Sequence, residues 1–473
     1  MQKIEQGHRH PEDRMEAFLR QPERSMIRLS IPIMVGMGIH VLYSMADMIF
    51  VGRLGGDAIA AVTFAGSFLF FMFALSAVSV GAQSLIARRM GEGDQQGSSR
   101  AATHALLLGV SLGTVFFFLG QPFAEGMLRL VGARNQALTM GTAYLKILFL
   151  GAPLLFFNAS CRSILTGEGD TKTPVLILAA STGLNIALDP IFIYLLGWGV
   201  PGAAWATLAA MLLSFVAYII FLFIRRASAV SFALRFRMPS WRVLREILTV
   251  GMPASLTMMI MSIGGMCFNR ILSIFGSDAV AAYGLGGRVD TVIVLPFIGI
   301  STALLSLVGM YYGASRADLV DRIAAYAIKK TLLAALVFGF LVYLFPAPLL
   351  RIFTSDASVI AIGKTYLRFI VFAYPMIAFG MNSGRILQGL GLGLPSLVIT
   401  STRVLLVSVP LAYLFTRVLG MGLSSVWTAI LISGCVSTFI SYVWLRTTLR
   451  SIGKSLLPLP GGGISVQMPP PQN

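Results

Sequence analysis

Charged residues are scarce in this chain: Asp, Glu, Lys and Arg together make up 12% of its 473 residues. A soluble protein of this length needs charge over its whole surface, roughly a quarter of its residues. Hydrophobic residues make up 56% instead. Most of the surface must therefore face something other than water, and we expect an integral membrane protein.

Cysteine and histidine are also few, which limits the possible chemistry. Cys161, Cys267 and Cys435 are far apart in the sequence, so they predict neither a disulfide framework nor a metal motif. No HExxH sequence occurs, and no pair of Asp residues on one helix suggests catalysis. The sequence GVSLG at 109–113 has the GxSxG pattern, but it lies within an apolar run and is typical of close helix packing. We therefore expect no enzymatic activity and no cofactor. The first 25 residues are polar, and we expect no cleavable signal peptide.

Apolar runs of about 20 residues, the length that crosses a bilayer, follow one another along nearly the whole chain. They predict an all-α membrane protein with twelve transmembrane helices. The expected spans are 27–51, 58–87, 101–123, 141–164, 174–196, 201–224, 247–274, 279–310, 323–345, 362–387, 395–418 and 421–445.

The net charge of +17 comes from Lys and Arg in the short segments between spans, which does not indicate nucleic-acid binding. These residues concentrate in alternate segments, and the positive-inside rule then places both termini in the cytoplasm. We expect the cytoplasmic (inner) membrane. The expected domains are an N-terminal arm (1–26), a first lobe (27–224), a basic linker (225–246), a second lobe (247–445) and a Pro/Gly-rich, partly disordered tail (446–473).

The two halves of the chain are similar to each other. GGDAIAAV at 55–62 recurs as GSDAVAAY at 276–283, and ILTG at 164–167 recurs as ILQG at 386–389. Each copy carries six spans, an even number, so both copies enter the membrane from the same side. We therefore expect two lobes related by a pseudo-two-fold axis along the membrane normal. Two lobes with a cleft between them favour a transporter over a receptor or a passive channel.

Several polar residues occur in only one copy, so a lobe can fold without them. In the first copy they are Asp47, Asn158, Asn185 and Asp189. Their counterparts in the second copy are Phe268, Gly380, Leu406 and Pro410. An ionised Asp at the bilayer centre costs about 2.5–3.5 kcal/mol. Such residues would be lost unless they were functional or compensated.

The spacing of these residues predicts a shared pocket. Asn185 and Asp189 are four residues apart and share a helix face, and His40, Tyr43 and Asp47 follow one stripe of the first span. Two carboxylates in a low-dielectric pocket disfavour simultaneous ionisation. The pair can therefore accept a proton near neutral pH, or hold Na⁺ with amide and hydroxyl oxygens beside it. The sequence leaves both alternatives open.

Simpler interpretations also remain. Asp47 could reach the outer membrane interface, the polar pair of the fifth span could join helices through hydrogen bonds, and His40 could be a packed histidine.

In the second copy, Arg288 lies about 14 Å into its span at 1.5 Å per residue. It could bind an anionic ligand or be neutralised within the fold. Asp290 is two residues away, on a different side of the helix, so the two need not pair.

Three motifs resemble the multidrug and toxic compound extrusion (MATE) family, in particular its archaeal and DinF-like branch. They are Asp47 followed by FVGRLGGDAIAAV, the LTGEGDTKTP loop at 165–174, and NIALDP at 185–190. The resemblance covers nearly the whole chain and implies efflux driven by inward H⁺ or Na⁺. The family's first-lobe cation site matches Asp47, Asn158, Asn185, Asp189 and Thr207, with Na⁺ expected at Asp47, Asn185, Asp189 and Thr207.

The resemblance also implies a substrate cleft and bending of the first span. We expect the cleft to include Pro32, His40, Tyr43, Tyr144, Arg288 and Asp290, with Pro32 at the bend. NorM-type members carry acidic residues in helices 7 and 10, and this chain has none there. That difference places the expected coupling in the first lobe.

We expect a monomeric antiporter that exports small, drug-like amphipathic compounds, often cationic, and that contacts membrane lipids. The alternative is a flippase for lipid-linked oligosaccharides. Such a protein needs several cationic residues in its cleft for a pyrophosphate, whereas Arg288 stands alone and two Asp residues would repel the ligand.

Overall fold

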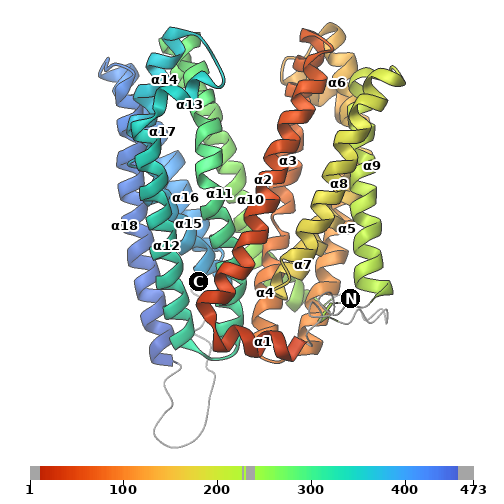
Figure 1. Ribbon diagram of the computed structural model, residues 1–473, viewed down its shortest axis with the longest axis vertical. Coiled ribbons are helices and arrows are strands. Elements are labelled where there is room, and N and C mark those ends of the chain that lie inside the picture. The colour runs from red at the N-terminus through yellow and green to blue at the C-terminus, as the bar shows by residue number, and fades with distance from the viewer. Residues whose placement is uncertain (1–10, 226–227, 231–239, 456–473) are drawn as a thin grey trace, which may run out of the picture.

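The structure is a computed structural model that describes residues 11–225, 228–230 and 240–455. In these ranges every regular element is a helix. The helices form two bundles that stand side by side and spread apart toward one end (Figure 1). Helix α1 (Pro11–Arg20) lies at the opposite end, together with the last turn of α18 (Ser424–Ser455). We call this end the α1 end.

The first lobe follows α1 and contains the first six spans. Its helices are α2 (Pro22–Gly52), α3 (Gly56–Ser76), α4 (Ser79–Gly91), α5 (Gln95–Leu130), α6 (Asn135–Leu150), α7 (Ala152–Gly167), α8 (Lys172–Pro190), η2 (Ile191–Leu195), α9 (Gly199–Ile219) and η3 (Ile220–Ile224).

The second lobe contains the remaining six spans and ends with α18. Its other helices are α10 (Trp241–Leu272), η4 (Ser273–Phe275), α11 (Ser277–Gly313), α12 (Ala317–Leu344), α13 (Pro346–Arg351), α14 (Ala357–Ile370), α15 (Tyr374–Gly389), α16 (Leu394–Ser401), η5 (Thr402–Ser408), α17 (Val409–Tyr413) and η6 (Leu414–Val418).

Ten helical segments in the described chain are long and apolar enough to cross a membrane, and two bent pairs bring the number to twelve. The bent pairs are α6 with α7, at 49°, and α14 with α15, at 53°. Pro153 and Pro375 occupy the first turn of the second helix in each pair, where the missing N–H is tolerated. The twelve-span prediction is thus confirmed, with the fourth and tenth spans broken rather than straight.

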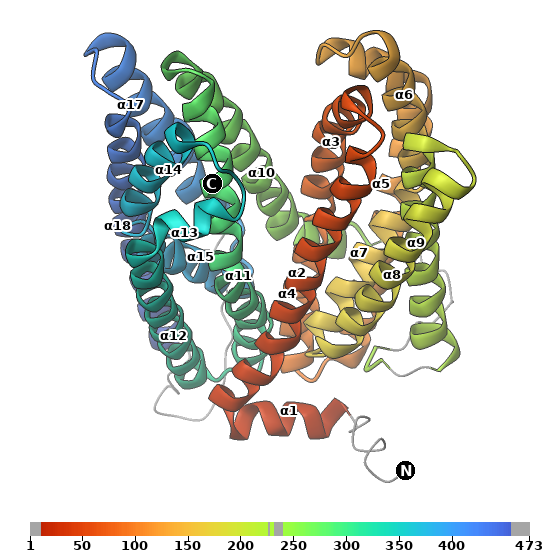
Figure 2. The same ribbon diagram turned by 45° about the horizontal axis from the view of Figure 1, so that its top comes forward.

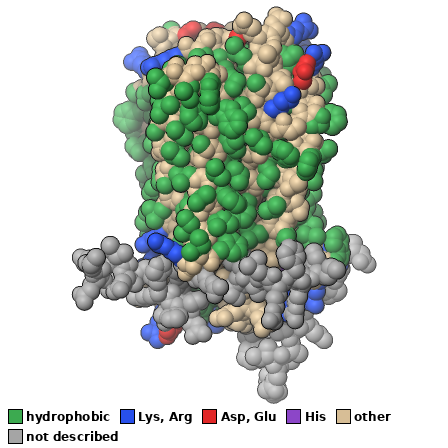
Figure 3. All heavy atoms as spheres, turned by 90° about the vertical axis from the view of Figure 1, so that its right-hand side faces the viewer, with side chains coloured by type: hydrophobic (Ala, Val, Ile, Leu, Met, Phe, Trp, Pro, Cys, Tyr) green, Lys and Arg blue, Asp and Glu red, His purple; other side chains and the backbone are tan. Residues whose placement is uncertain are grey.

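The outer face of the first lobe has the surface of a protein that sits in a bilayer. Hydrophobic side chains cover its middle, and charged side chains lie near its two ends (Figure 3). Large apolar side chains are exposed across the molecule, including Phe118 (67%) and Leu176 (69%). Lipid is the solvent that makes this exposure favourable. The chain is a multi-pass membrane protein.

The two lobes meet near the α1 end, where α4 crosses α11. A Cβ added to Gly91 would lie 2.0 Å from the carbonyl oxygen of Met310, and one added to Gly313 would lie 2.0 Å from that of Arg88. The two contacts are related by the same offset, since 313 − 91 = 222 and 310 − 88 = 222. The crossing therefore obeys the pseudo-two-fold symmetry, and only glycine permits so close a backbone approach.

Buried polar side chains also join the lobes at this end. The amide of Gln83 donates to Ser306 Oγ (2.9 Å), and Ser306 Oγ donates to the carbonyl of Thr166 (2.8 Å). Ser84 Oγ donates to the carbonyl of Gln388. Each of these three buried donors therefore has an acceptor where the lobes meet, as buried polar groups normally do.

Helix α1 lies against both lobes at the α1 end (Figure 2). Phe18 is 6% exposed, and its ring is so close to Gly169 of the first lobe that a Cβ there would lie 2.6 Å from it. The carbonyl of Phe18 accepts a hydrogen bond from Tyr311 of the second lobe (2.8 Å). Glu23, at the start of α2, pairs with Arg322 of α12 (3.1 Å).

Three predicted domain boundaries fall inside helices. The arm predicted at 1–26 overlaps α2, which begins at Pro22. The linker predicted at 225–246 overlaps α10, which begins at Trp241, and the tail predicted at 446–473 begins inside α18, which continues to Ser455. The remainder of that tail, at 456–473, lies outside the described residues. Part of the linker contacts the first lobe, where the backbone N–H of Ala229 donates to Glu168 (3.0 Å).

Candidate cation-coupling site

Asp189 occupies the last turn of α8, where the helix changes its winding. Its side chain is fully buried, and Pro190 follows it directly and ends the α-helix. Proline removes a backbone donor, and the chain continues as the π-helix η2. The second lobe has a similar arrangement at Pro410, which is followed by η6. The winding therefore belongs to the fold, whereas the carboxylate belongs to the first lobe alone.

Asp47 approaches Asp189 from α2. The two carboxylates are close enough to interact electrostatically. Nearby, the hydroxyl of Tyr194 in η2 donates to the carbonyl of Phe50 in α2 (2.6 Å). The structure therefore brings together two acidic residues that are 142 positions apart (189 − 47 = 142).

The polar atoms of this pocket lack hydrogen-bond partners within the described chain. Asn185 is 1% exposed, and neither its amide nitrogen nor its oxygen is bonded. Both oxygens of Asp189 and Oδ1 of Asp47 are likewise buried and unbonded. Unsatisfied buried polar groups are rare and destabilising. A helix-joining role for Asn185 and Asp189 would have produced side-chain hydrogen bonds, and the described residues provide none.

Tyrosine and threonine side chains border the carboxylate pair. The hydroxyl of Tyr43 lies 3.4 Å from Thr207 Oγ1, and Thr207 also donates to the carbonyl of Ala203 (3.1 Å). Tyr43 interacts electrostatically with both carboxylates, as does Tyr144. Tyr144 is 5% exposed and packs in the apolar core of the first lobe. Its expected place in an open cleft is therefore not what the structure shows.

The other first-lobe residues lie in different environments. Asn158 donates to the carbonyl of Met211 (3.0 Å), while its buried oxygen is unbonded within the described chain. His40 is exposed, with its ring centroid 5.9 Å from that of Tyr43. This exposure disfavours the alternative of a packed histidine, and its place in the substrate cleft stays a prediction. Pro32 lies inside α2, which continues through it as one helix.

The donor set suits either a proton or Na⁺. Two carboxylates, one amide oxygen and one hydroxyl are hard oxygen ligands. In the described part of the chain no cluster contains three or more His, Cys, Asp or Glu side chains, so the acidic charge at the pocket comes from two carboxylates. Either cation would weaken the repulsion between Asp47 and Asp189 and satisfy oxygens that lack partners.

Asp290 has a different environment from the one expected. Its carboxylate accepts hydrogen bonds from Tyr366 and from Tyr374 (2.7 Å), two residues of the second lobe. Trp427 and Tyr283 complete an aromatic cluster around Tyr366, with ring centroids 4.9 and 5.6 Å from it. Asp290 therefore points into the core of the second lobe rather than into the substrate cleft, and its two oxygens are satisfied.

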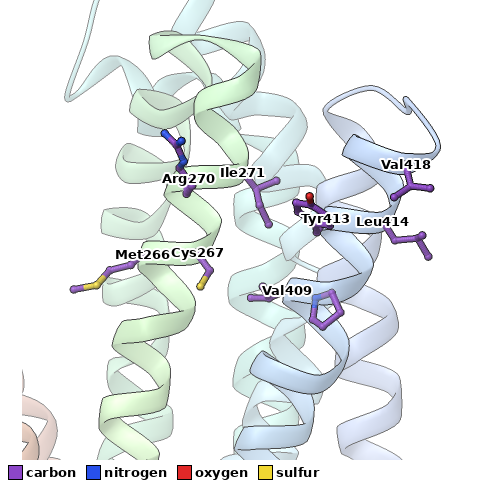
Figure 4. A pocket seen from close by; sticks show the side chains of 9 residues that line it. Met266, Cys267, Arg270, Ile271, Val409, Tyr413, Leu414 and Val418 are labelled. Carbon is purple, nitrogen blue, oxygen red and sulfur yellow. The ribbon is translucent and has the colours of Figure 1, made fainter.

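A mostly apolar groove in the second lobe includes the repeat partner of Asp189. The groove, about 770 Å³ in volume, lies between α10 and the helices α17 and η6, near the end opposite α1. Most of its lining is hydrophobic, and Arg270 and Tyr413 stand toward its upper end (Figure 4). The groove includes Pro410, the repeat partner of Asp189. At Pro410 the second lobe thus has an apolar surface where the first lobe buries the carboxylate of Asp189.

The family profile called MatE matches this chain over residues 32–191 and 253–414, one segment in each lobe. The chain belongs to the MatE family. This membership confirms the MATE resemblance and the two-lobe fold class. The matched segments cover most of both repeats, including the carboxylate pair.

Relatives of this MatE protein carry names that refer to multidrug resistance. It is 29% identical to "Probable multidrug resistance protein NorM" of Thermotoga maritima, over 85% of this chain and 88% of the relative. It is 28% identical to "Probable multidrug resistance protein YpnP" of Bacillus subtilis, over 89% of this chain and 95% of the relative.

A solved structure has the same architecture. That structure is described as a MOP superfamily transporter from Pyrococcus furiosus. Its sequence is 34% identical to this chain, and the match covers 91% of this chain and 97% of the solved chain with a TM-score of 0.88. Another, titled as an outward-facing conformation of a multidrug resistance MATE family transporter, also has a TM-score of 0.88 at 34% identity over 92% of this chain and 97% of its own.

Two groups of residues in this MatE protein escaped the sequence analysis. The glycines of the lobe crossing, Gly91 and Gly313, are related by the repeat offset and could have been found by aligning the copies. The tyrosines that bind Asp290, Tyr366 and Tyr374, had no such signal. They lie 76 and 84 residues from Asp290, and only the packing of the lobe shows the contact.

Proposed function

We propose that the protein is a secondary active antiporter that exports small amphipathic, often cationic, compounds in exchange for H⁺ or Na⁺. The observation that carries the proposal is the Asp47 and Asp189 pair beside Asn185, with buried oxygens that lack hydrogen-bond partners in the described chain. Relatives named as multidrug resistance proteins support the substrate class. The cation gradient would supply the energy for uphill export, and this site would couple cation entry to substrate exit.

Helix α2 provides a route from the cation site to the interface between the lobes. It carries Asp47, and it also passes α11 of the second lobe, where a Cβ on Gly299 would lie 2.4 Å from Met34 and 3.2 Å from the carbonyl of Ser30. Pro32 lies between these two contact residues. Cation binding that changes the bend of α2 at Pro32 would therefore alter the packing of the lobes.

The proposed cycle is alternating access. The lobes meet near the α1 end through the glycine crossing and spread apart toward the other end (Figure 1). The Lys and Arg bias favours placing the α1 end on the cytoplasmic side of the inner membrane. The space between the lobes would then be open to the outside. Rocking of the lobes would then expose the cleft to the cytoplasm. One chain contains both lobes, and a monomer suffices for the cycle.

Exchange of tetraphenylphosphonium in proteoliposomes tests the proposal. An imposed pH gradient and an imposed Na⁺ gradient are compared, and one of them should drive uptake against the substrate gradient. Asp47→Asn and Asp189→Asn should each lower the driven rate at least tenfold. The control is Asp278→Asn, a second-lobe carboxylate that accepts a bond from Ser358 far from the pair. Unchanged driven uptake in both first-lobe variants would refute the mechanism.

A further inference from the structure

Arg288 is a cation within a membrane span that has no anionic partner in the described chain. It lies eleven residues after α11 begins, about 16 Å along the helix at 1.5 Å per residue. Its side chain is exposed. No Asp or Glu of the described residues forms a salt bridge with it. Asp290, which is two residues away, is held by Tyr366 and Tyr374 instead.

The guanidinium points across the boundary between the lobes. Its Nη2 atom lies 3.8 Å from Sδ of Met48 in α2. Met48 is 56% exposed, and the residue before it is Asp47. The second lobe thus places a positive charge next to the helix of the first lobe that carries a coupling carboxylate. A thioether is only a weak acceptor, so this contact does not neutralise the guanidinium.

The internal repeat shows that the fold does not need this arginine. Gly287 corresponds to Gly66 at the offset of 221 (287 − 66 = 221), and Arg288 then corresponds to Ser67. A lobe can therefore form the same helix with a small neutral residue. Charged residues in spans are rare because their burial is costly, and those that persist usually mark a functional site.

We propose that Arg288 binds the anionic group of a transported amphiphile, so that compounds with a carboxylate or phosphate are substrates alongside purely cationic ones. The proposal rests on the export function proposed above and adds a substrate class to it. The guanidinium offers a planar pair of N–H donors that matches a carboxylate or a phosphate. A zwitterion could place its anionic group on Arg288 while its cationic part faces Asp47 of the first lobe.

Two dyes that differ in one group provide the test. Rhodamine 110 carries a free carboxylate, and rhodamine 123 is its methyl ester with the same ring system. Their binding to the purified full-length transporter is measured by fluorescence anisotropy in phosphatidylcholine nanodiscs. Arg288→Gln should raise the Kd of rhodamine 110 about tenfold, equivalent to about 1.4 kcal/mol, and change that of rhodamine 123 less than twofold. Arg288→Lys should give an intermediate Kd for rhodamine 110.

Arg270→Gln is the matched control. Arg270 is also an exposed arginine of the second lobe and forms no salt bridge with the described residues. Its replacement should leave both Kd values within twofold. An unchanged Kd for rhodamine 110 in Arg288→Gln, or an equal rise for both dyes, would overturn the proposal. Variants are compared only as monodisperse protein, and Arg288→Lys covers the case in which Arg288→Gln does not fold.

A lipid phosphate is the other source of the same anionic chemistry. The measurement is therefore repeated in nanodiscs that contain phosphatidylglycerol. The wild-type Kd for rhodamine 110 should stay within twofold of its value in phosphatidylcholine. A large rise that is absent in Arg288→Gln would assign the arginine to a lipid head group and overturn the proposal. Because these assays measure binding, their outcome is separate from gradient-driven uptake, whose failure would refute the export function.

Discussion

Replacing Gly91 by alanine should shift the balance between the two orientations of the transporter. The added Cβ would lie 2.0 Å from the carbonyl oxygen of Met310, whereas such carbon–oxygen contacts are normally about 3.3 Å or longer. The helices α4 and α11 must then separate by about an ångström. Overpacking costs about 1–3 kcal/mol, and here the strain falls only on the state in which the lobes meet at the α1 end. A difference of that size changes an equilibrium by about 5–150-fold.

Distances between spin labels at the other end report this balance. Suitable positions are Leu130, the last residue of α5, and Val418, the last residue of η6, which are 89% and 65% exposed. The free cysteines Cys161, Cys267 and Cys435 are replaced first. If the lobes rock, opening the α1 end brings the opposite ends together. Gly91→Ala should therefore move the distribution measured by double electron–electron resonance toward shorter distances.

A glycine within one lobe separates this effect from general destabilisation. A Cβ on Gly113 would lie 2.5 Å from Cα of Pro153, and both residues belong to the first lobe. Gly113→Ala should lower the Tm and leave the distance distribution unchanged. Gly313→Ala, at the symmetry-related contact, should act like Gly91→Ala. If Gly91→Ala folds and leaves the distribution unchanged, or if Gly113→Ala shifts it equally, the glycine crossing does not control the orientation of the lobes.

Three further variants have expected outcomes that follow from their contacts. Asp290→Asn should lower the Tm, because hydrogen bonds to a charged group contribute about 1.5–3 kcal/mol each. If Asp290→Asn instead abolished gradient-driven exchange as completely as Asp47→Asn, the coupling would lie in the second lobe. Phe18→Ala should release α1, because loss of a buried phenyl ring costs about 3–5 kcal/mol. Hydrogen–deuterium exchange in residues 11–20 should then accelerate. Unchanged exchange would mean that Phe18 does not hold the helix. Glu246→Gln removes a half-exposed ion pair with Arg89 (3.4 Å) that joins the lobes, and such pairs contribute about 0–1 kcal/mol. It should shift the spin-label distances far less than Gly91→Ala, and an equal shift would contradict this ranking.

The transmembrane spans and the internal repeat were predictable from the sequence. Each span depends on the transfer free energy of its own run of about 20 residues, so it can be recognised without knowing its neighbours. The repeat also pointed to the carboxylate pair, because Asp47 and Asp189 have no acidic counterparts at Phe268 and Pro410. Comparison of the copies identified polar residues without which a lobe can fold.

The partners of individual side chains were decided by the tertiary structure. Asp290 was predicted to line the cleft, but two tyrosines from α14 and α15 hold it inside the second lobe. Nothing in the sequence indicates that Phe18 lies between Gly169 and Tyr311, which belong to different lobes. Apolar runs determine which segments enter the membrane. Which side chains meet there depends on close packing between helices that are far apart in the chain, and no local window of sequence contains that information.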